Sequence, residues 1–134
     1  MRIWDEHDIE NKVRAILDVE ARGTEHHFGR PFLTPYQIAI AFKRRFRSVF
    51  DEIGMDVGGR ATNTRRSFAR YVARELSARI SDKKIKDIEG RFLHNQGLYM
   101  LQYKHGSETV ESSLLSADLS LFRLKDSDNQ NVEK

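Results

Sequence analysis

The sequence predicts a single α+β domain, with helices in its first part and a β-hairpin or small antiparallel sheet after them. Three observations support this prediction. Apolar residues recur at helical spacing as far as residue 80, and this spacing changes after residue 83. The later segments are rich in aromatic and aliphatic residues and are bounded by glycine turns. A length of 134 residues, 39% hydrophobic and 32% charged, fits one globular domain over 1–125 followed by a polar tail over 126–134.

The composition excludes several classes of protein. The chain has no cysteine, so disulfides, thiolate zinc sites and cysteine nucleophiles are excluded. It has no run of eighteen apolar residues, and its first twelve residues lack the apolar stretch of a secretory signal. We therefore expect a cytoplasmic protein without a membrane segment.

Positive charge is concentrated in the middle of the chain. Residues 1–40 carry five basic and seven acidic side chains, residues 41–104 carry fifteen and seven, and residues 105–134 carry three and six. The balances are −2, +8 and −3, which add to the net charge of +3. The basic middle indicates an anionic partner. The alternative is that the acidic ends neutralise it within the fold or across a dimer.

The first expected helix runs from Asp5 or Asp8 to Arg22. Acidic residues in its first turns complement the helix dipole, and Gly23 offers a stop. Its apolar face consists of Ile9, Val13, Ile16 and Leu17. The adjacent His26 and His27 that follow are expected in a loop, because no third ligand lies at metal-binding spacing.

The second expected helix starts at the clearest local signal in the chain. Thr34 is placed to be the N-cap, Pro35 fits the first helical position, and Gln37 completes a capping box. Gly54 ends the helix. Its apolar face is expected in the core and comprises Ile38, Ala41, Phe42, Phe46, Val49, Phe50 and Ile53, with Lys43, Arg44 and Arg47 opposite.

A third helix is expected from Thr64 to Ile80, capped by Thr62, Asn63 or Thr64. Phe68, Val72, Leu76 and Ile80 form its apolar face. On the other face, Arg66, Arg70 and Arg74 recur at i, i+4 and i+8, where like charges repel each other. This arginine stripe indicates that a polyanion supplies the compensating charge.

The loop before this helix contains Gly58 and Gly59, which permit close approach. A phosphate at the free N–H groups of the helix terminus would also meet Arg60, Arg65 or Arg66. The loop is not a Walker-type P-loop, because the lysine and hydroxyl residue are missing, and it is not a dinucleotide fingerprint, because a helix precedes it. The alternative is a glycine turn with ordinary capping.

After Lys83 the pattern predicts strands. Residues 85–93 and 98–103 are expected to pair as a hairpin through the turn at 94–97. A second turn follows at 105–107. The segment 108–124 is expected to hold a further strand, a short helix near 112–118, or both.

A basic helix followed by a two-stranded ribbon resembles the winged-helix DNA-binding module over about residues 35–104. The resemblance lies in the architecture and not in a sequence motif. It implies that the helix from Thr64 to Ile80 is the recognition helix and that Lys83, Lys84, Lys86 and Arg91 lie in or near the wing. The connection over 54–63 is longer than a standard helix-turn-helix turn.

The leading functional expectation is binding of nucleic acid, duplex DNA before RNA, by a small regulatory or accessory protein. Arginine forks suit phosphates and guanine edges, and hydroxyl groups and loop amides position the backbone. The expected contact residues are Arg60, Thr62, Thr64, Arg65, Arg66, Arg70, Arg74, Lys83, Lys84, Lys86 and Arg91.

Two other classes remain open. In the first, the arginine stripe meets the acidic Asp5–Glu20 face of a second copy in a homodimer, with Leu119, Leu121 and Phe122 as exposed apolar contacts. In the second, Gln102-Tyr103-Lys104 with Asp87 and Glu89 resembles a degenerate strand motif of PD-(D/E)xK nucleases, which implies magnesium and a catalytic Lys104. Glutamine stands where that motif has a carboxylate. The sequence predicts no enzyme, no cofactor and no metal site.

Overall fold

The structure, a computed structural model, describes residues 3–20, 28–59, 64–112 and 119–126. Helices dominate the first part of this described chain, and strands follow. The predicted α+β class is confirmed. The helical elements are α1 (Ile3–Glu6), α2 (Ile9–Leu17), α3 (Pro35–Arg45), α4 (Arg47–Ile53), the 3-10 turn η1 (Thr64–Arg66) and α5 (Phe68–Ser81). The strands are β1 (Ile88–Leu93), β2 (Gln102–His105), β3 (Glu108–Glu111) and β4 (Leu119–Leu124).

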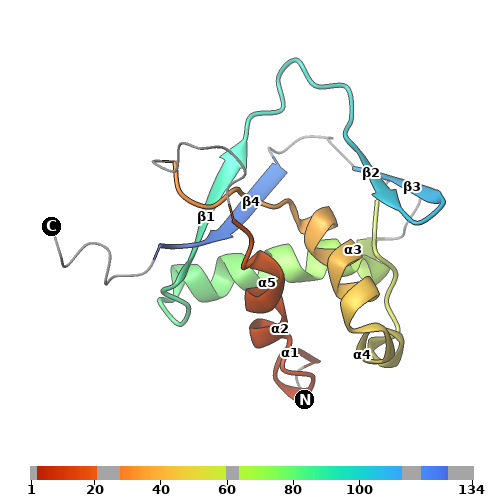
Figure 1. The fold of residues 1–134 in the computed structure, drawn as a ribbon, viewed down its shortest axis with the longest axis horizontal. Coiled ribbons are helices and arrows are strands. Elements are labelled where there is room, and N and C mark those ends of the chain that lie inside the picture. Colours follow the sequence, from red (N-terminus) through yellow and green to blue (C-terminus); the bar gives the residue numbers. More distant parts are fainter. Residues whose placement is uncertain (1–2, 21–27, 60–63, 113–118, 127–134) are drawn as a thin grey trace, which may run out of the picture.

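Helix α5 runs through the middle of the molecule (Figure 1). Helices α1 and α2 lie below α5 in this view, and α3 and α4 lie near its right-hand end. The four strands form two separate antiparallel pairs, β1 with β4 and β2 with β3. The two pairs stand on opposite sides of the view, joined by the segment 94–101, which extends away from the helices. The two sheets thus contact the helices at two separate places.

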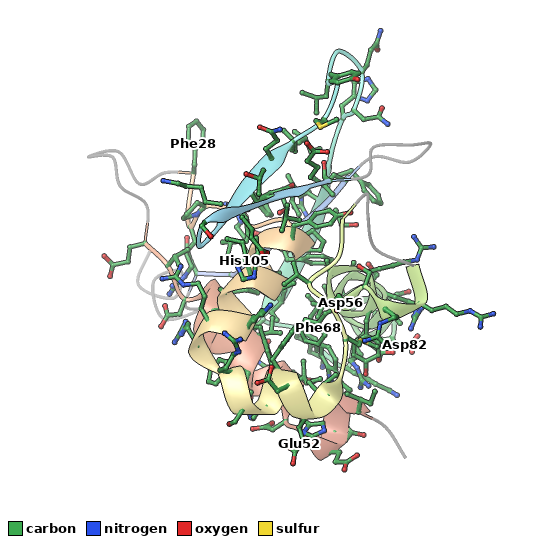
Figure 2. The ribbon with its side chains drawn as sticks, turned by 90° about the vertical axis from the view of Figure 1, so that its right-hand side faces the viewer. Phe28, Glu52, Asp56, Phe68, Asp82 and His105 are labelled. Atoms are coloured by element: carbon green, nitrogen blue, oxygen red, sulfur yellow. The ribbon has the colours of Figure 1, made fainter. Side chains whose placement is uncertain are left out.

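The core forms where the apolar faces of the helices meet. The Phe42 and Phe68 rings lie 4.8 Å apart between centroids, and Phe50 meets Phe68 edge-on at 5.5 Å. Phe68 is completely enclosed, as its interior position in Figure 2 shows. The expected faces of α2, α3 and α5 are confirmed by the burial of Ile9, Val13, Ile16, Leu17, Ile38, Phe42, Phe50, Phe68, Val72 and Leu76.

The start of α3 is confirmed in detail. The Gln37 amide donates to Thr34 Oγ1 at 3.2 Å, and the Thr34 amide donates to Gln37 Oε1 at 2.8 Å. Pro35 occupies the first turn. Gly54, with φ of 80°, ends α4 as predicted. Local side-chain chemistry was sufficient to define these two boundaries.

Two expected helices are each interrupted. Asp8 adopts a left-handed φ of 51° and separates α1 from α2, which ends at Leu17 and not at Arg22. At Phe46, φ of −128° and ψ of 55° separate α3 from α4. The expected stop at Gly23 and the loop histidines 26 and 27 lie outside the described residues.

The predicted hairpin between 85–93 and 98–103 is wrong. Strand β1 pairs with the distant β4, with Ile88 opposite Leu124 and Leu93 opposite Leu119. The hairpin that forms is β2–β3 around the predicted turn at 105–107. Leu98 and Tyr99 are exposed and lie outside the strands. The further strand expected within 108–124 is confirmed as β4, whereas the possible helix near 112–118 falls largely on undescribed residues.

Strand β4 belongs to the core and is not an exposed surface. The side chains of Leu119 and Phe122 are 8% and 2% exposed, and Leu121 is partly buried. Leu33 exchanges both backbone hydrogen bonds with Phe122, at 2.8 and 2.9 Å. These residues therefore do not offer the apolar dimer contact that the sequence suggested.

A bidentate ion pair joins α2 to the start of β1. Arg14 Nε and Nη2 donate to the two carboxylate oxygens of Asp87 at 2.8 and 3.0 Å. These hydrogen bonds lower the pKa of Asp87 below its ordinary value, although burial opposes the shift. Because the folded pKa is the lower one, this stabilisation is present above the ordinary pKa and is lost as pH falls through the folded pKa.

Asp87→Asn is expected to reduce the free energy of unfolding at pH 7 by about 0.5 kcal/mol, since the pair is half exposed. Urea unfolding between pH 7 and pH 3 measures this difference, which should shrink as Asp87 becomes protonated in the wild type. Asp82→Asn is the matched control, because Asp82 is exposed and has no ion pair among the described residues. A constant difference across this pH range would contradict the assignment.

Candidate nucleic-acid interface

The solvent face of α5 carries Arg70 and Arg74, which are both exposed. Beyond them, the same face presents small side chains at Ser77, Ala78 and Ser81. The 14-residue helix is about 21 Å long. Its exposed face therefore combines two guanidinium groups with small residues that leave room for close approach by a partner.

The arginine stripe predicted from the sequence is shorter in the structure. Arg66 lies in η1, before α5, and its Nε is 3.3 Å from Asp56 Oδ2. Its Nη2 also donates to the Gly54 carbonyl at 2.9 Å. Arg66 therefore does not continue the helical row of Arg70 and Arg74.

Arg79, five residues after Arg74, makes contacts within the protein. Its Nη2 lies 3.1 Å from Glu75 Oε1, and its guanidinium lies over the Trp4 ring at 5.0 Å. The Arg74 guanidinium lies over the Tyr71 ring at 5.8 Å but stays exposed. The ridge that faces solvent on α5 consists of Arg70 and Arg74.

The N–H groups at the start of α5 are hydrogen-bonded within the protein. Ser67 is the N-cap, in place of the predicted Thr62, Asn63 or Thr64, and its Oγ accepts from the Arg70 amide at 3.1 Å. The amides of Phe68 and Ala69 donate to the carbonyls of Asp56 and Val57 at 2.8 and 3.0 Å. The first three N–H groups of the helix are thus already paired, which removes the predicted phosphate position at this terminus.

The glycine pair allows the loop to pack closely against the start of α5 and against β3. Gly58 and Gly59 have φ of 124° and 116°. A Cβ on Gly58 would lie 2.3 Å from Ser67 Oγ, and one on Gly59 would lie 2.8 Å from the Glu111 backbone oxygen. The glycines were expected to let a ligand approach the backbone. In the structure, Ser67 at the start of α5 and Glu111 of β3 occupy this space.

A basic pocket lies at the other end of α5. It has a volume of about 370 Å³, and Ile80, Ile85 and Ile88 contribute its apolar lining. We call its four cations the basic pocket residues: Lys83, Lys86, Arg91 and Lys125. The acidic residue in the lining, Glu89, is already neutralised, because its carboxylate lies 2.6 Å from Arg123 Nε and 3.1 Å from Arg91 Nη2.

The open edge of β1 borders this pocket. Both backbone groups of Phe122 bond Leu33, so Phe122 and its partner Gly90 form a non-hydrogen-bonded pair. Gly90 therefore directs its backbone N–H away from β4, toward the edge beside the pocket. The Gly90 carbonyl accepts a hydrogen bond from Arg91 Nη1 at 2.8 Å. A backbone donor and four cations thus surround one concave surface.

The structure brings some predicted contact residues together and separates others. Lys83, Lys86 and Arg91 share the basic pocket, and the exposed Lys84 follows Lys83 in the turn after α5. Arg65 is exposed in η1, away from this end of α5. Arg60 and Thr62 lie outside the described residues, as does the side chain of Thr64.

Lys125 was missed by the sequence analysis. The strand-like pattern before it was recognised, but its partner strand was not. Lys125 reaches the pocket because its amide donates to the Asp87 carbonyl at 2.8 Å, which extends the β1–β4 register. A correct pairing of these two strands would have identified it.

The nuclease-like fragment is dispersed. Lys104 lies on β2, whereas Asp87 and Glu89 lie at β1 and are bound to Arg14 and Arg123. Within the described ranges, no group of three or more histidine, cysteine, aspartate or glutamate residues is arranged to hold a metal ion.

Comparisons with known proteins give no relative: no family model, no curated protein and no solved structure matches this chain. Among the helices that the structure describes, none has the length and apolar character needed to cross a membrane.

Proposed function

We propose that this protein binds nucleic acid, duplex DNA before RNA, as a small regulatory or accessory factor. The observation that carries the proposal is the basic pocket, where Lys83, Lys86 and Lys125 make no ion pair among the described residues, and where Arg91 shares the one acidic side chain, Glu89, with Arg123. Such a cluster produces a positive potential that attracts an anion. A row of phosphates supplies that anion, and Arg70 and Arg74 extend the positive surface along α5.

The expected mode of binding is electrostatic. Lysine and arginine side chains neutralise phosphates and release counterions, so affinity falls steeply as salt rises. The small residues on the solvent face of α5 let the helix approach the duplex, and the apolar lining of the basic pocket packs beneath the lysine stems. Phosphate contacts of this kind position the protein without reading sequence.

A salt series of binding measurements tests the proposal with duplex DNA, single-stranded DNA and RNA of equal length. Lys86→Ala/Lys125→Ala is expected to weaken duplex binding and to lower the salt slope by about two units. Arg44→Ala/Lys104→Ala is the matched control, because it removes two exposed cations that lie outside the pocket. Equal effects of the two double variants would reject the pocket as the contact.

A homodimer through acidic and basic faces is the second candidate. It is favoured by Asp5 and Glu6, which are exposed on α1 and have no ion pair among the described residues. Glu10 and Asp18, from the same predicted acidic face, are already paired with Arg14 and Arg30. Light scattering of the wild type and of Arg70→Glu measures the alternative: a dimer lost in the variant, with no retention of DNA, would favour it.

A further inference from the structure

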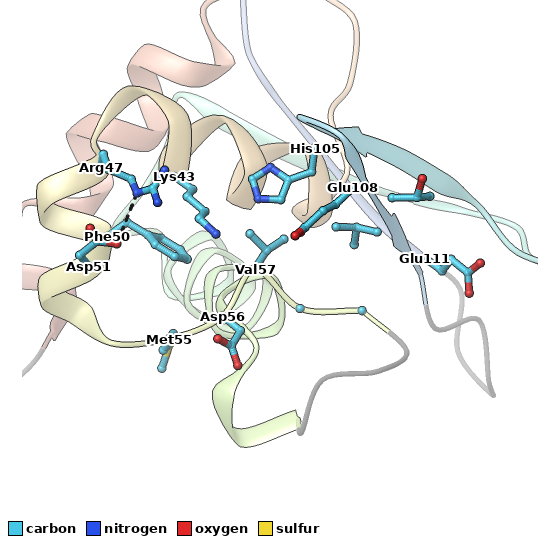
Figure 3. Close-up of a pocket in the computed structure, with 14 residues that line it drawn as sticks. Lys43, Arg47, Phe50, Asp51, Met55, Asp56, Val57, His105, Glu108 and Glu111 are labelled. Carbon is cyan, nitrogen blue, oxygen red and sulfur yellow. Dashed lines mark ion pairs between the residues drawn. The ribbon is translucent and has the colours of Figure 1, made fainter.

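A second pocket lies on another part of the molecule, between α3–α4, the loop 55–59 and the β2–β3 hairpin (Figure 3). Its volume is about 510 Å³, within the range of small-molecule sites. Lys43 enters it from α3, His105 from β2 and Glu108 from β3. Figure 3 shows these three side chains pointing toward one another above Val57. Helix α3 and the β2–β3 hairpin, which are distant in sequence, thus bring three ionisable side chains together.

Two of these groups lack a counter-ion or hydrogen-bond partner within the described residues. The Nδ1 atom of His105 is enclosed and accepts or donates no hydrogen bond. The Lys43 ammonium lies over the Phe50 ring at 5.6 Å and makes no ion pair with a described carboxylate. Because this nitrogen is enclosed, a ligand in the pocket can reach only the other ring nitrogen, Nε2, together with the Lys43 ammonium.

Other charged groups around His105 are largely satisfied. Arg47 lies 3.6 Å from Asp51, and Asp56 lies 3.3 Å from Arg66. The Glu111 carboxylate accepts from Gln102 Nε2 at 3.2 Å. Arg44 is exposed on α3 and contributes a further positive field at His105. Glu108 is exposed and remains available as an acceptor at the pocket mouth.

We infer that this pocket binds a phosphate monoester that carries hydroxyl groups, such as a nucleotide or a sugar phosphate. The phosphate lies between Lys43 and His105, and Glu108 accepts from a ligand hydroxyl. Phe50, Met55 and Val57 provide an apolar surface for the rest of the ligand. This inference is independent of the proposed nucleic-acid interface.

The electrostatics of His105 agree with a phosphate ligand. Burial lowers the pKa of His105, the positive charges of Lys43, Arg47 and Arg44 lower it further, and Glu108 partly opposes them. Without a bound anion, these effects favour the neutral imidazole over the charged one. A phosphate monoester titrates near pH 6 and shares a proton with such a ring. Binding should raise the pKa of His105, and the affinity should increase as pH falls.

NMR titration of the histidine rings tests the inference, with His105→Gln identifying the His105 signals. Adding 5′-AMP or ribose 5-phosphate is expected to raise the pKa of His105 by about one unit. Inorganic phosphate should give a weaker response, because it makes no contact with Glu108 or the apolar surface. An equal response would overturn the hydroxyl-bearing part of the assignment. No change in the His105 pKa would overturn the site.

Three variants separate this site from the rest of the protein. Lys43→Met keeps an unbranched side chain of similar length, removes the charge and should abolish the ligand-induced shift, with circular dichroism confirming the fold. Arg47→Gln, which removes a more distant charge, should reduce the shift and gives a second test should Lys43→Met unfold. Arg70→Ala/Arg74→Ala should leave the shift intact. Loss of the shift in this last variant, or its persistence in folded Lys43→Met, would overturn the assignment.

Discussion

Replacing Arg70, Arg74, Lys86 and Lys125 with alanine is expected to remove most of the salt dependence of nucleic-acid binding. Each phosphate contact contributes about 0.9 to the slope of log affinity against log salt, so the slope should fall by between three and four units. Over a fourfold increase in salt, the wild type should lose on the order of a hundredfold more affinity than the variant. Fluorescence anisotropy with labelled duplex measures both.

The control for this prediction is Arg66→Ala. The sequence places Arg66 in the same stripe as Arg70 and Arg74, whereas the structure pairs it with Asp56 and the Gly54 carbonyl. Its removal should change the salt slope by less than removal of Arg70 alone. If Arg66→Ala and Arg70→Ala flatten the slope equally, the distinction between the arginine paired with Asp56 and the arginine without an ion pair among the described residues is wrong.

Gly59→Ala is expected to give the largest loss of stability among single changes in the loop before α5, about 2 to 4 kcal/mol. The backbone at φ of 116° disfavours any side chain, and the new Cβ would lie 2.8 Å from the backbone oxygen of Glu111. That oxygen belongs to β3 and cannot rotate away. Urea unfolding followed by circular dichroism measures the change in free energy.

Gly54→Ala separates the cost of a side chain on a left-handed backbone from the cost of the contact with β3. Gly54 has a left-handed φ of 80°, and its Cβ would meet nothing within 4 Å. This variant should therefore show the backbone cost alone, about 1 kcal/mol. A similar loss in both variants would show that the contact with β3 adds nothing. Because the site proposed at Lys43 adjoins this loop, Gly59→Ala should also weaken the response of His105 to 5′-AMP.

The sequence determined those features that depend on near neighbours in the chain. The capping box at Thr34 and Gln37 needs only residues three apart, and Gly54 ends its helix through its own backbone freedom. The buried faces of α2, α3 and α5 follow from a spacing of three and four residues, which fixes one side of a helix regardless of what covers it. The basic middle of the chain was likewise visible from composition.

The helix interruptions depended on longer-range packing. Asp8 and Phe46 are neither glycine nor proline, yet their non-helical backbone angles interrupt the helix at each position. The cap of α5 moved to Ser67 because the segment at Asp56 and Val57 pairs with the first amides of that helix. Several hydroxyl residues near one helix start are equivalent as caps until a neighbouring segment selects one.

The candidate site was decided by tertiary structure. The sequence identified Lys83, Lys86 and Arg91 as cations, but their convergence with Lys125 required β1 to pair with β4, 26 residues beyond its end by chain numbering. The pocket of Lys43 and His105 likewise needs α3 to face the β2–β3 hairpin. Charges and turns are local properties that the sequence displays directly. Strand partners, and the ion pairs that leave some arginines exposed and others engaged, depend on contacts between distant residues, which only the folded chain defines.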